Sequence, residues 1–251
     1  MPLRGVPVPG KMKSSRLISA FIRGAKAAGG RRANAWVFFG VTDKIAEKFD
    51  EVKAKGDDYY YGDNSYFDRM RGKMFRFTKN AVQVACRHNL EHRTSTRWGK
   101  LGIYVWGPRV LTPVPPCKCS ECSKTAYTLV VEQSANFMRH VAKAPNYFAE
   151  VRAGYDRIRW RPWTREKAAI CRTLDYDLQG ANQVVTWSSS AAIEASLRGI
   201  PIVVSPMSAF YGLEWEQREK AAALLADNQW TLGELRSGTA WRMLQENRLW
   251  V

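Results

Sequence analysis

The amino-acid sequence predicts an α/β protein with two parallel-sheet lobes and helices at its C-terminal end, on three observations. Apolar runs of strand length alternate with segments of helical periodicity along most of the 251 residues. A stretch with four prolines and no periodicity, residues 107–124, interrupts this alternation. The composition is 45% hydrophobic and 12% aromatic, which is enough apolar surface for a buried core.

The first lobe is expected over residues 1–106. Helical spacing of Leu17 and Phe21 predicts a helix, and the apolar run AWVFFGV after it predicts a buried strand. Thr42 then caps a helix with the sequence DKIAEKFDEVKAKG, and DYYYG follows as a strand. A strand, a helix and a strand in this order predict parallel pairing with a right-handed crossover. The runs MFRFT and KLGIYVW predict two further strands.

The second lobe is expected over residues 127–251, after a linker over residues 107–126. Strands YTLVVEQ, RIRW, QVVTW and PIVVS alternate with helices around NFMRHV, YFAEVRAGY, TREKAAICRTL and SAAIEASLRG, which predicts a second parallel sheet. Two helices follow at the C-terminal end, the second with a capping box of Thr231 and Glu234. Two such lobes leave a cleft at the carboxyl ends of their strands, where ligands bind in this architecture.

Three consecutive hydroxyl side chains, Ser188, Ser189 and Ser190, follow the strand QVVTW. They occupy the N-cap and first turn of the next helix, where unpaired N–H groups and the helix dipole favour an anion. A plain N-cap explains one serine well and three poorly, so these residues are interpreted as a phosphate site. Arg159 and Arg161 share one face of the strand RIRW and are expected at the same edge, because arginine forks suit phosphate. Pairing of these arginines with acidic side chains is the alternative.

The stretch VVTWSSSAAIEASLRGIPIVVSPMSAF resembles the C-terminal lobe of GT-B-type glycosyltransferases of the capsular-polysaccharide kind. The segments YYYGDNSYFDR, FRFTKNAVQ, VEQSANF, RIRWRPW and LADNQWTLGELRSGTAWRML make the chain similar to phage- and prophage-encoded members of that group. The resemblance implies a compact GT-B-like fold of two Rossmann-like lobes. It also implies transfer of a sugar from a nucleotide-sugar, the phosphate being held by the C-terminal lobe and the acceptor by the N-terminal lobe, with no metal or other cofactor required. The chain departs from the group in its shorter length and its cysteine-bearing linker.

The candidate general base is a carboxylate that follows the strand DYYYG. Asp63 and Asn64 lie there, at the edge that faces the expected cleft, and the neighbouring tyrosines are expected to desolvate the carboxylate and raise its pKa. A turn in which the two residues cap their own backbone is the alternative. Asn64 is also a candidate for positioning donor or acceptor. Arg76 and Lys79, in the next strand region, are candidates for positioning an acceptor or else form a solvated edge.

Three residues of the second lobe complete the candidates for positioning donor or acceptor. Gln133 and Ser134 lie where the first strand of this lobe meets its helix, and Ser134 acting only as an N-cap is the alternative. Glu194 lies in the helix that follows the serines.

A zinc site is a weaker alternative. Cys117, Cys119 and Cys122 lie in one loop, with Cys86, His88 or His92 as a fourth ligand, but C-x-C-x₂-C lacks the paired knuckles of familiar zinc sites, so free thiols are favoured. The Asp-Tyr-Asp sequence at 175–177 matches an Asp-x-Asp metal motif but is expected in a loop that precedes a strand, so it is discounted. The sequence also lacks the glycine-rich motifs of dinucleotide and P-loop enzymes and the G-x-S-x-G of serine hydrolases.

The net charge of +16 predicts a polyanionic partner. Residues 1–32 contain basic side chains and no acid, which suits an arm along phosphates or, alternatively, a solubilising surface. On charge alone we expect the acceptor to be DNA, at a modified base flipped from the duplex. A surface glycan or lipid-linked acceptor is an alternative, as is a non-catalytic nucleic-acid-binding protein on a transferase-like scaffold.

A membrane partner is not expected. No window approaches the ~18 apolar residues of a spanning helix. The odd number of cysteines agrees with a reducing compartment. We therefore expect a cytoplasmic protein, in the host cytoplasm if it is phage-encoded.

Overall fold

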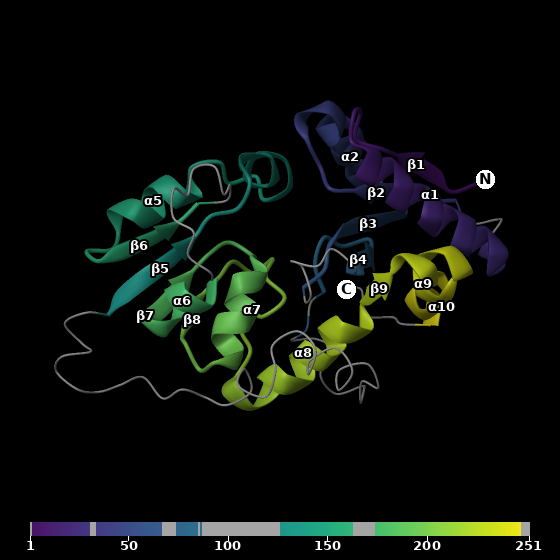
Figure 1. Ribbon diagram of the computed structural model, residues 1–251. Helices are drawn as coiled ribbons and strands as arrows, with labels where there is room; N and C mark the ends of the chain where they lie inside the picture. The colour runs from purple at the N-terminus through teal and green to yellow at the C-terminus, as the bar shows by residue number, and fades with distance from the viewer. Residues whose placement is uncertain are drawn as a thin grey trace. The chain divides into compact units, whose positions relative to one another are not determined.

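The computed structural model describes residues 2–30, 34–66, 74–84, 86, 126–162 and 174–246, and the structural statements below refer to these. The chain forms two compact units, one of Met1–Val105 with Ala223–Val251 and one of Trp106–Ala222. Each unit has its own sheet (Figure 1). This confirms the α/β class and the two-sheet architecture.

The first unit is built on a sheet with the strand order β1-β2-β3-β4-β9. The first three strands in this order are mutually parallel, as the β-α-β pattern predicts, whereas β4 is antiparallel to both β3 and β9. This sheet is therefore mixed, and not wholly parallel as expected. The described elements of the unit are β1 (Arg4–Val6), α1 (Met12–Ala27), β2 (Trp36–Phe39), α2 (Asp43–Ala54), β3 (Tyr59–Asn64), β4 (Met74–Lys79), β9 (Gln229–Thr231), α9 (Leu232–Ser237) and α10 (Thr239–Glu246).

Aromatic side chains fill the core of the first unit. Phe21 of α1 is fully buried and stacks on Phe77 of β4 with ring centroids 4.5 Å apart. Trp241 of α10 meets Phe21 edge-on at 5.9 Å. Burying side chains of this size contributes about 1.5–3 kcal/mol each. The helical periodicity seen in the sequence around Phe21 is therefore the buried face of α1.

The C-terminal segment belongs to the first unit, which differs from the expected lobe over residues 127–251. Trp230 of β9 pairs with Phe75 of β4, and its side chain is fully buried. Leu235 and Trp241 join the same hydrophobic cluster. The physical reason is that these apolar side chains complete the core around α1. Local sequence patterns cannot predict a contact between segments so far apart in the chain. The helix α8 (Arg218–Asp227) spans the boundary between the two units.

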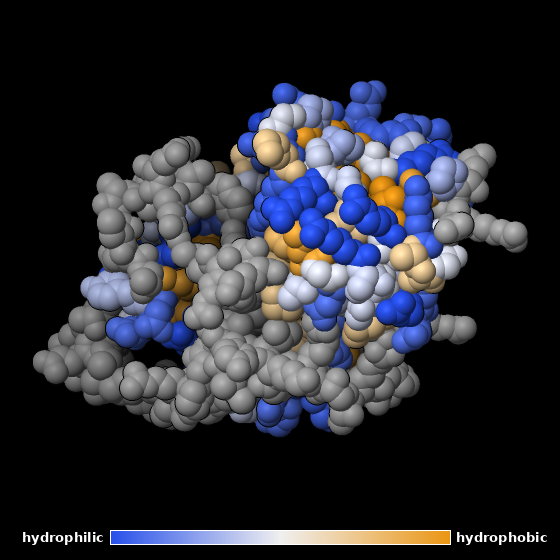
Figure 2. Space-filling model, turned by 45° about the vertical axis from the view of Figure 1, so that its right-hand side comes forward, coloured by the Kyte–Doolittle hydropathy of each residue, from blue (hydrophilic) through white to orange (hydrophobic). Residues whose placement is uncertain are grey.

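The basic N-terminal segment is folded, in contrast to the expected arm along phosphates. Arg4 lies in β1, which pairs with β2, and α1 follows it. Leu17 and Phe21 anchor α1 in the core, while Lys13 and Arg16 lie on its exposed side. On the face of this unit seen in Figure 2, hydrophilic surface surrounds patches of apolar surface.

The second unit has a sheet in which every strand is parallel, in the order β6-β5-β7-β8. Leu129, Val131 and Val184 of this sheet pack against Ala191 and Ala195. Small side chains on the helix let it lie close to the sheet. The described elements are β5 (Tyr127–Val131), η4 (Phe137–Val141), α5 (Tyr147–Ala153), β6 (Ile158–Arg161), α6 (Leu174–Gln179), β7 (Ala181–Val185), α7 (Ser190–Leu197), β8 (Ile202–Val203) and η5 (Trp215–Gln217).

Some predicted elements lie outside the described residues, namely the strand KLGIYVW, nearly all of the linker over 107–126 and most of the helix TREKAAICRTL. The Asp-Tyr-Asp sequence forms part of α6, where a loop was expected. No helix in the described ranges has the length and apolar character needed to cross a bilayer.

Candidate functional site

The serine turn lies at the carboxyl edge of the parallel sheet, directly after β7, and a glutamine from the neighbouring strand region holds it. The backbone N–H of Ser188 donates to Oε1 of Gln133 at 2.6 Å, and Nε2 of Gln133 donates to Oγ of Ser188 at 3.2 Å. Thr186 ties the same two strands together, since its hydroxyl donates to the carbonyl of Val131 at 2.7 Å. Two residues that the sequence proposes separately, Gln133 and Ser188, are therefore in direct contact.

Ser189 and Ser190 begin the helix α7. Ser189 is the N-cap, and its Oγ accepts a hydrogen bond from the N–H of Ala191 at 3.3 Å. Both serines are partly exposed, whereas Ser188 is buried. A helix N-terminus with partly exposed hydroxyls favours an anion through the helix dipole and the first-turn N–H groups. Ser188 thus supports the turn, and Ser189 and Ser190 are the hydroxyls that a ligand can reach.

Ser134 follows Gln133 directly in the chain, and Trp187 directly precedes Ser188. Oγ of Ser134 accepts from the N–H of Phe137 at 3.1 Å, so Ser134 caps η4, as its alternative interpretation proposes. The ring of Trp187 meets Tyr147 edge-on at 4.9 Å. This aromatic pair was not among the sequence candidates.

The two arginines of β6 do not contact the serine turn, which corrects the expected phosphate clamp. Nη1 of Arg161 lies 2.6 Å from Oδ2 of Asp177, and Nη1 of Arg159 donates to the hydroxyl of Tyr127 at 2.6 Å. Arg159 also lies 3.8 Å from Oδ1 of Asp177. Asp177 is buried in α6, and a buried negative charge is costly unless a positive charge pairs with it. The two guanidinium groups supply that positive charge. Pairing with an acidic side chain, the alternative, is what the structure shows.

Glu194 of α7 belongs to a second ion-pair network. Its Oε1 accepts from Nη2 of Arg198 at 2.8 Å, and Nη1 of Arg198 lies 2.6 Å from Oδ1 of Asp175. Burial raises the pKa of Glu194, and the nearby Arg198 opposes that rise. Glu194 is thus engaged with its own helix instead of standing open to a ligand.

Asp63 is the penultimate residue of β3, whereas the sequence pattern predicts it after the strand, and it is held on both carboxylate oxygens. Oδ2 accepts from Nη2 of Arg76 at 3.0 Å, and Oδ1 accepts from the backbone N–H of Asn64 at 2.7 Å. The second bond is local, but both residues lie within β3 and pair with β4, so the turn of the alternative interpretation is not formed. The Asp63 side chain is 28% exposed, so it remains in reach of solvent. The carboxylate is oriented by its partners, and its role as a base stays a prediction.

Arg76 is buried, which corrects its expected role in positioning an acceptor. Its Nη1 donates to the hydroxyl of Tyr66 at 2.7 Å and to the side chain of Gln83, and its guanidinium stacks on the Tyr66 ring. Burial raises the pKa of Tyr66 and, further, that of Tyr61. The tyrosines expected to wall an open site are instead part of the core, because their rings supply the apolar cover of β3.

The remaining candidates of the first unit lie at the surface. Oδ1 of Asn64 accepts from Nζ of Lys13 at 2.7 Å, and Nζ of Lys79 lies 3.7 Å from Asp58. Lys13 was not singled out as a site residue.

The zinc alternative cannot be placed, since Cys117, Cys119 and Cys122 lie outside the described residues with His88 and His92. Within the described ranges no group of three or more histidine, cysteine or acidic side chains is placed to hold a metal ion. Cys86 is buried, and burial raises the pKa of its thiol.

The two sheets, one of them all parallel, define a mixed α/β protein of the GT-B-like kind. No protein-family model and no curated protein matches the sequence. Among solved structures the chain is similar to a Thermosulfurimonas dismutans KpsC structure described as a β Kdo 2,7 transferase, with 12% identity, a TM-score of 0.50 and coverage of 98% of this chain and 99% of that chain. A second structure, described as the β Kdo 2,4 transferase of the same KpsC, matches with 14% identity, a TM-score of 0.45 and coverage of 89% of each chain. At these identities the likeness concerns the fold.

Proposed function

We propose that this protein is a glycosyltransferase that moves a sugar from a nucleotide-sugar donor to a hydroxyl group of a glycan. The observation that carries the proposal is the contact between Gln133 and Ser188, which presents Ser189 and Ser190 at the start of α7. The turn lies at the carboxyl edge of an all-parallel sheet, where such folds bind ligands. The fold likeness to a structure described as a sugar transferase supports the same class.

The chemistry assigns a role to each part of the turn. Breaking the anomeric C–O bond places negative charge on the leaving phosphate, and fixed donors stabilise that charge more in the transition state than in the ground state. Ser189 and Ser190 supply hydroxyl donors, and the dipole of α7 adds a favourable field. Gln133 keeps the turn in place through Ser188, which lowers the reorganisation needed when the charge develops. Removal of one such donor typically costs about 3–4 kcal/mol of activation free energy.

The acceptor hydroxyl needs a base, and we keep Asp63 as the candidate. Its carboxylate is oriented by Arg76 and by the N–H of Asn64, and it retains solvent access. A base of this kind must lie within hydrogen-bond reach of the hydroxyl that it deprotonates. Asp63→Asn keeps the shape of the side chain and removes its basicity, so it tests this assignment directly.

A glycan is a better supported acceptor than DNA. The expectation of a DNA acceptor depended on net charge, and the basic N-terminal segment that would line phosphates is folded into β1 and α1. The similar solved structure with a TM-score of 0.50 is described as a Kdo transferase, so the nucleotide-activated form of Kdo is the first donor to test.

The test is a matrix of donors and acceptors. Nucleotide-activated sugars, Kdo included, are incubated with the protein and with an oligosaccharide, plain duplex DNA or hydroxymethylated duplex DNA, and donor cleavage and acceptor mass are followed. We expect donor cleavage that increases with the oligosaccharide. Retention of DNA with no cleavage of any donor would instead indicate a nucleic-acid-binding protein.

Substitutions at the serine turn test whether its hydroxyl groups contribute to turnover. The double variant Ser189→Ala with Ser190→Ala is expected to lower kcat by about 100-fold or more, on the donor energies given above. Ser19→Ala, at an exposed serine of α1, is the matched control and should retain wild-type turnover. A double variant with full activity would exclude the serine turn as the phosphate site.

A further inference from the structure

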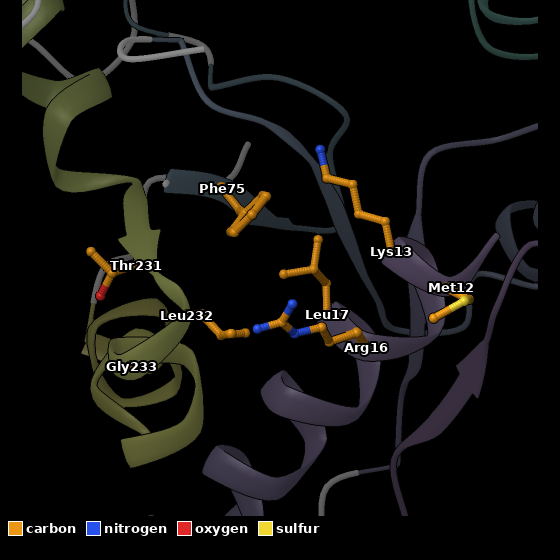
Figure 3. Close-up of a pocket in the computed structure, with 8 residues that line it drawn as sticks. All are labelled: Met12, Lys13, Arg16, Leu17, Phe75, Thr231, Leu232 and Gly233. Atoms are coloured by element: carbon orange, nitrogen blue, oxygen red, sulfur yellow. The ribbon is translucent and has the colours of Figure 1, made fainter. Parts of the chain in front are cut away.

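A pocket of about 600 Å³ lies within the first unit, between the start of α1, the strand β4 and the start of α9 (Figure 3). None of the candidate site residues lines it. The volume lies in the range of about 300–1,000 Å³ that is usual for small-molecule sites. Its lining residues are Met12, Lys13, Arg16, Leu17, Phe75, Thr231, Leu232 and Gly233.

Two cationic side chains from successive turns of α1 line the pocket. Nζ of Lys13 lies 5.2 Å from the centroid of the Phe75 ring and 2.7 Å from Oδ1 of Asn64. Arg16 extends toward Leu232 in Figure 3 and is exposed, with no hydrogen-bond or ion-pair partner in the described part of the chain. The pocket therefore carries positive charge on one wall.

No acidic side chain is among the lining residues. The acid in the first turn of α9, Glu234, is engaged in the capping box, where its Oε2 accepts from the N–H of Thr231 at 2.8 Å and from the Thr231 hydroxyl at 3.0 Å. The N-cap of α1, Lys11, makes no side-chain capping bond, so the positive end of that helix adds to the field. Charge, helix dipole and lining residues all favour a negatively charged ligand.

The other walls of the pocket are apolar. Leu17 and Phe75 are buried, and Leu232 is partly buried. Met12 also lines the pocket, and its side chain is 88% exposed. A bare phosphate or carboxylate would leave these walls without a partner. The lining suits a ligand in which an anionic group is attached to a body such as a sugar ring.

We infer that this pocket binds an anionic sugar, with Lys13 and Arg16 on its carboxylate or phosphate and Phe75 and Leu232 against its ring. This inference rests on the proposed function and names the acceptor class, a glycan that ends in a sugar acid or a sugar phosphate. Duplex DNA fits less well, because backbone contacts to DNA use cations spread along the phosphates and no enclosed apolar wall.

Binding is tested by NMR of the protein labelled with ¹³C at its methionine methyl groups. The chain has seven methionines, of which Met12 lines the pocket and Met138 is buried in the second unit. Glucuronate, glucose 6-phosphate and neutral glucose are titrated in turn. We expect Met12 to shift with one or both anions and to stay unchanged with glucose, while Met138 stays unchanged throughout. The stronger anion identifies the carboxylate or the phosphate form.

Three variants locate the site. Lys13→Met with Arg16→Met should weaken binding of the anion about tenfold or more, the usual cost of losing hydrogen bonds to a charged group. Arg23→Met with Lys26→Met removes the same charge from exposed positions further along α1 and should leave binding at the wild-type level. Gly233→Trp fills the pocket while keeping both cations, and a Cβ at this position meets only the Thr231 hydroxyl oxygen, at 3.8 Å. It should also abolish the Met12 shift.

The outcomes are distinct. The inference is overturned if both double variants lose the same amount of affinity for the anion, or if glucose binds as well as glucuronate. It is also overturned if duplex DNA shifts Met12 more strongly than either anionic sugar does. Binding of glucuronate through Lys13 and Arg16 without cleavage of any donor would support the pocket and defeat the transferase. Donor cleavage by a protein in which Met12 responds to neither anion would defeat the pocket and leave the transferase standing.

Discussion

The side-chain amide of Gln133 holds Ser188 by two hydrogen bonds, one from the Ser188 N–H at 2.6 Å and one to its Oγ at 3.2 Å. Gln133→Leu leaves the Ser188 N–H without this acceptor, and an unsatisfied buried group costs about 1–3 kcal/mol. We expect the free energy of unfolding in urea to fall by that amount and donor cleavage to fall more than stability alone explains. Gln133→Glu keeps the acceptor oxygen and is the control. A Gln133→Leu variant with unchanged cleavage would show that the turn needs no such support.

Asp177 holds the two arginines of β6. Asp177→Asn removes the charge that Arg161 contacts at 2.6 Å, and breaking a buried ion pair on one side costs about 3–5 kcal/mol. Because Arg159 and Arg161 are 28% and 30% exposed, solvent compensates them in part, and we expect a loss of about 2 kcal/mol in urea unfolding. Asp175→Asn, at a side chain that is 58% exposed, should change stability by less than about 1 kcal/mol. Equal effects of the two substitutions would contradict this assignment.

Gly24 marks the place where α1 and α9 touch through their backbones. A Cβ at Gly24 would lie 1.9 Å from the carbonyl oxygen of Leu235 and 2.8 Å from the N of Gly238, so the helices must move apart. Gly24→Ala should lower the free energy of unfolding by about 3 kcal/mol. Gly154→Ala is the control, because a Cβ there meets its nearest atoms at 3.8 Å or more and should change stability by less than about 0.5 kcal/mol. A thermal melt of both variants gives the comparison.

The raised pKa of Glu194 should be visible in the pH dependence of the free energy of unfolding. Its folded-state pKa is raised, chiefly by burial, so the folded protein holds this proton more tightly than the unfolded chain does. The stabilising contribution is complete below the unfolded pKa and is lost as the pH rises through the folded value. The free energy of unfolding of the wild type minus that of Glu194→Gln should therefore fall as the pH rises above about 4.3, the ordinary pKa of a glutamate. A difference that rises with pH would mean that Arg198 outweighs burial.

Local patterns predicted the elements whose causes are local. The run of Ile45, Phe49 and Val52 is the buried face of α2, and the capping box of Thr231 and Glu234 forms as expected. Thr42 precedes α2 as predicted but makes no side-chain capping bond. Periodicity and cap chemistry act within a few residues, which is why the sequence shows them.

The partners of charged side chains were not predictable in the same way. Asp177 meets Arg161 only after α6 packs on the sheet, and Arg76 is buried only because Tyr66 and Gln83 come to lie beside it. A charged residue looks the same in a sequence whether it is exposed or paired in the interior. The spacing of Leu174 and Leu178 was the available sign that the Asp-Tyr-Asp segment is helical.

The strand β9 and the helices α9 and α10 are synthesised after the second unit, yet they complete the sheet and core that begin with β1. While the ribosome is still making the second unit, the nascent first unit exposes the edge of β4 and the apolar face of α1 that Trp230 and Trp241 later cover. The intervening unit can fold first as a compact insertion, and the first unit is completed only when β9, α9 and α10 have been synthesised. The dependence of folding on chaperones should therefore be set by the time that passes between the synthesis of β4 and that of β9.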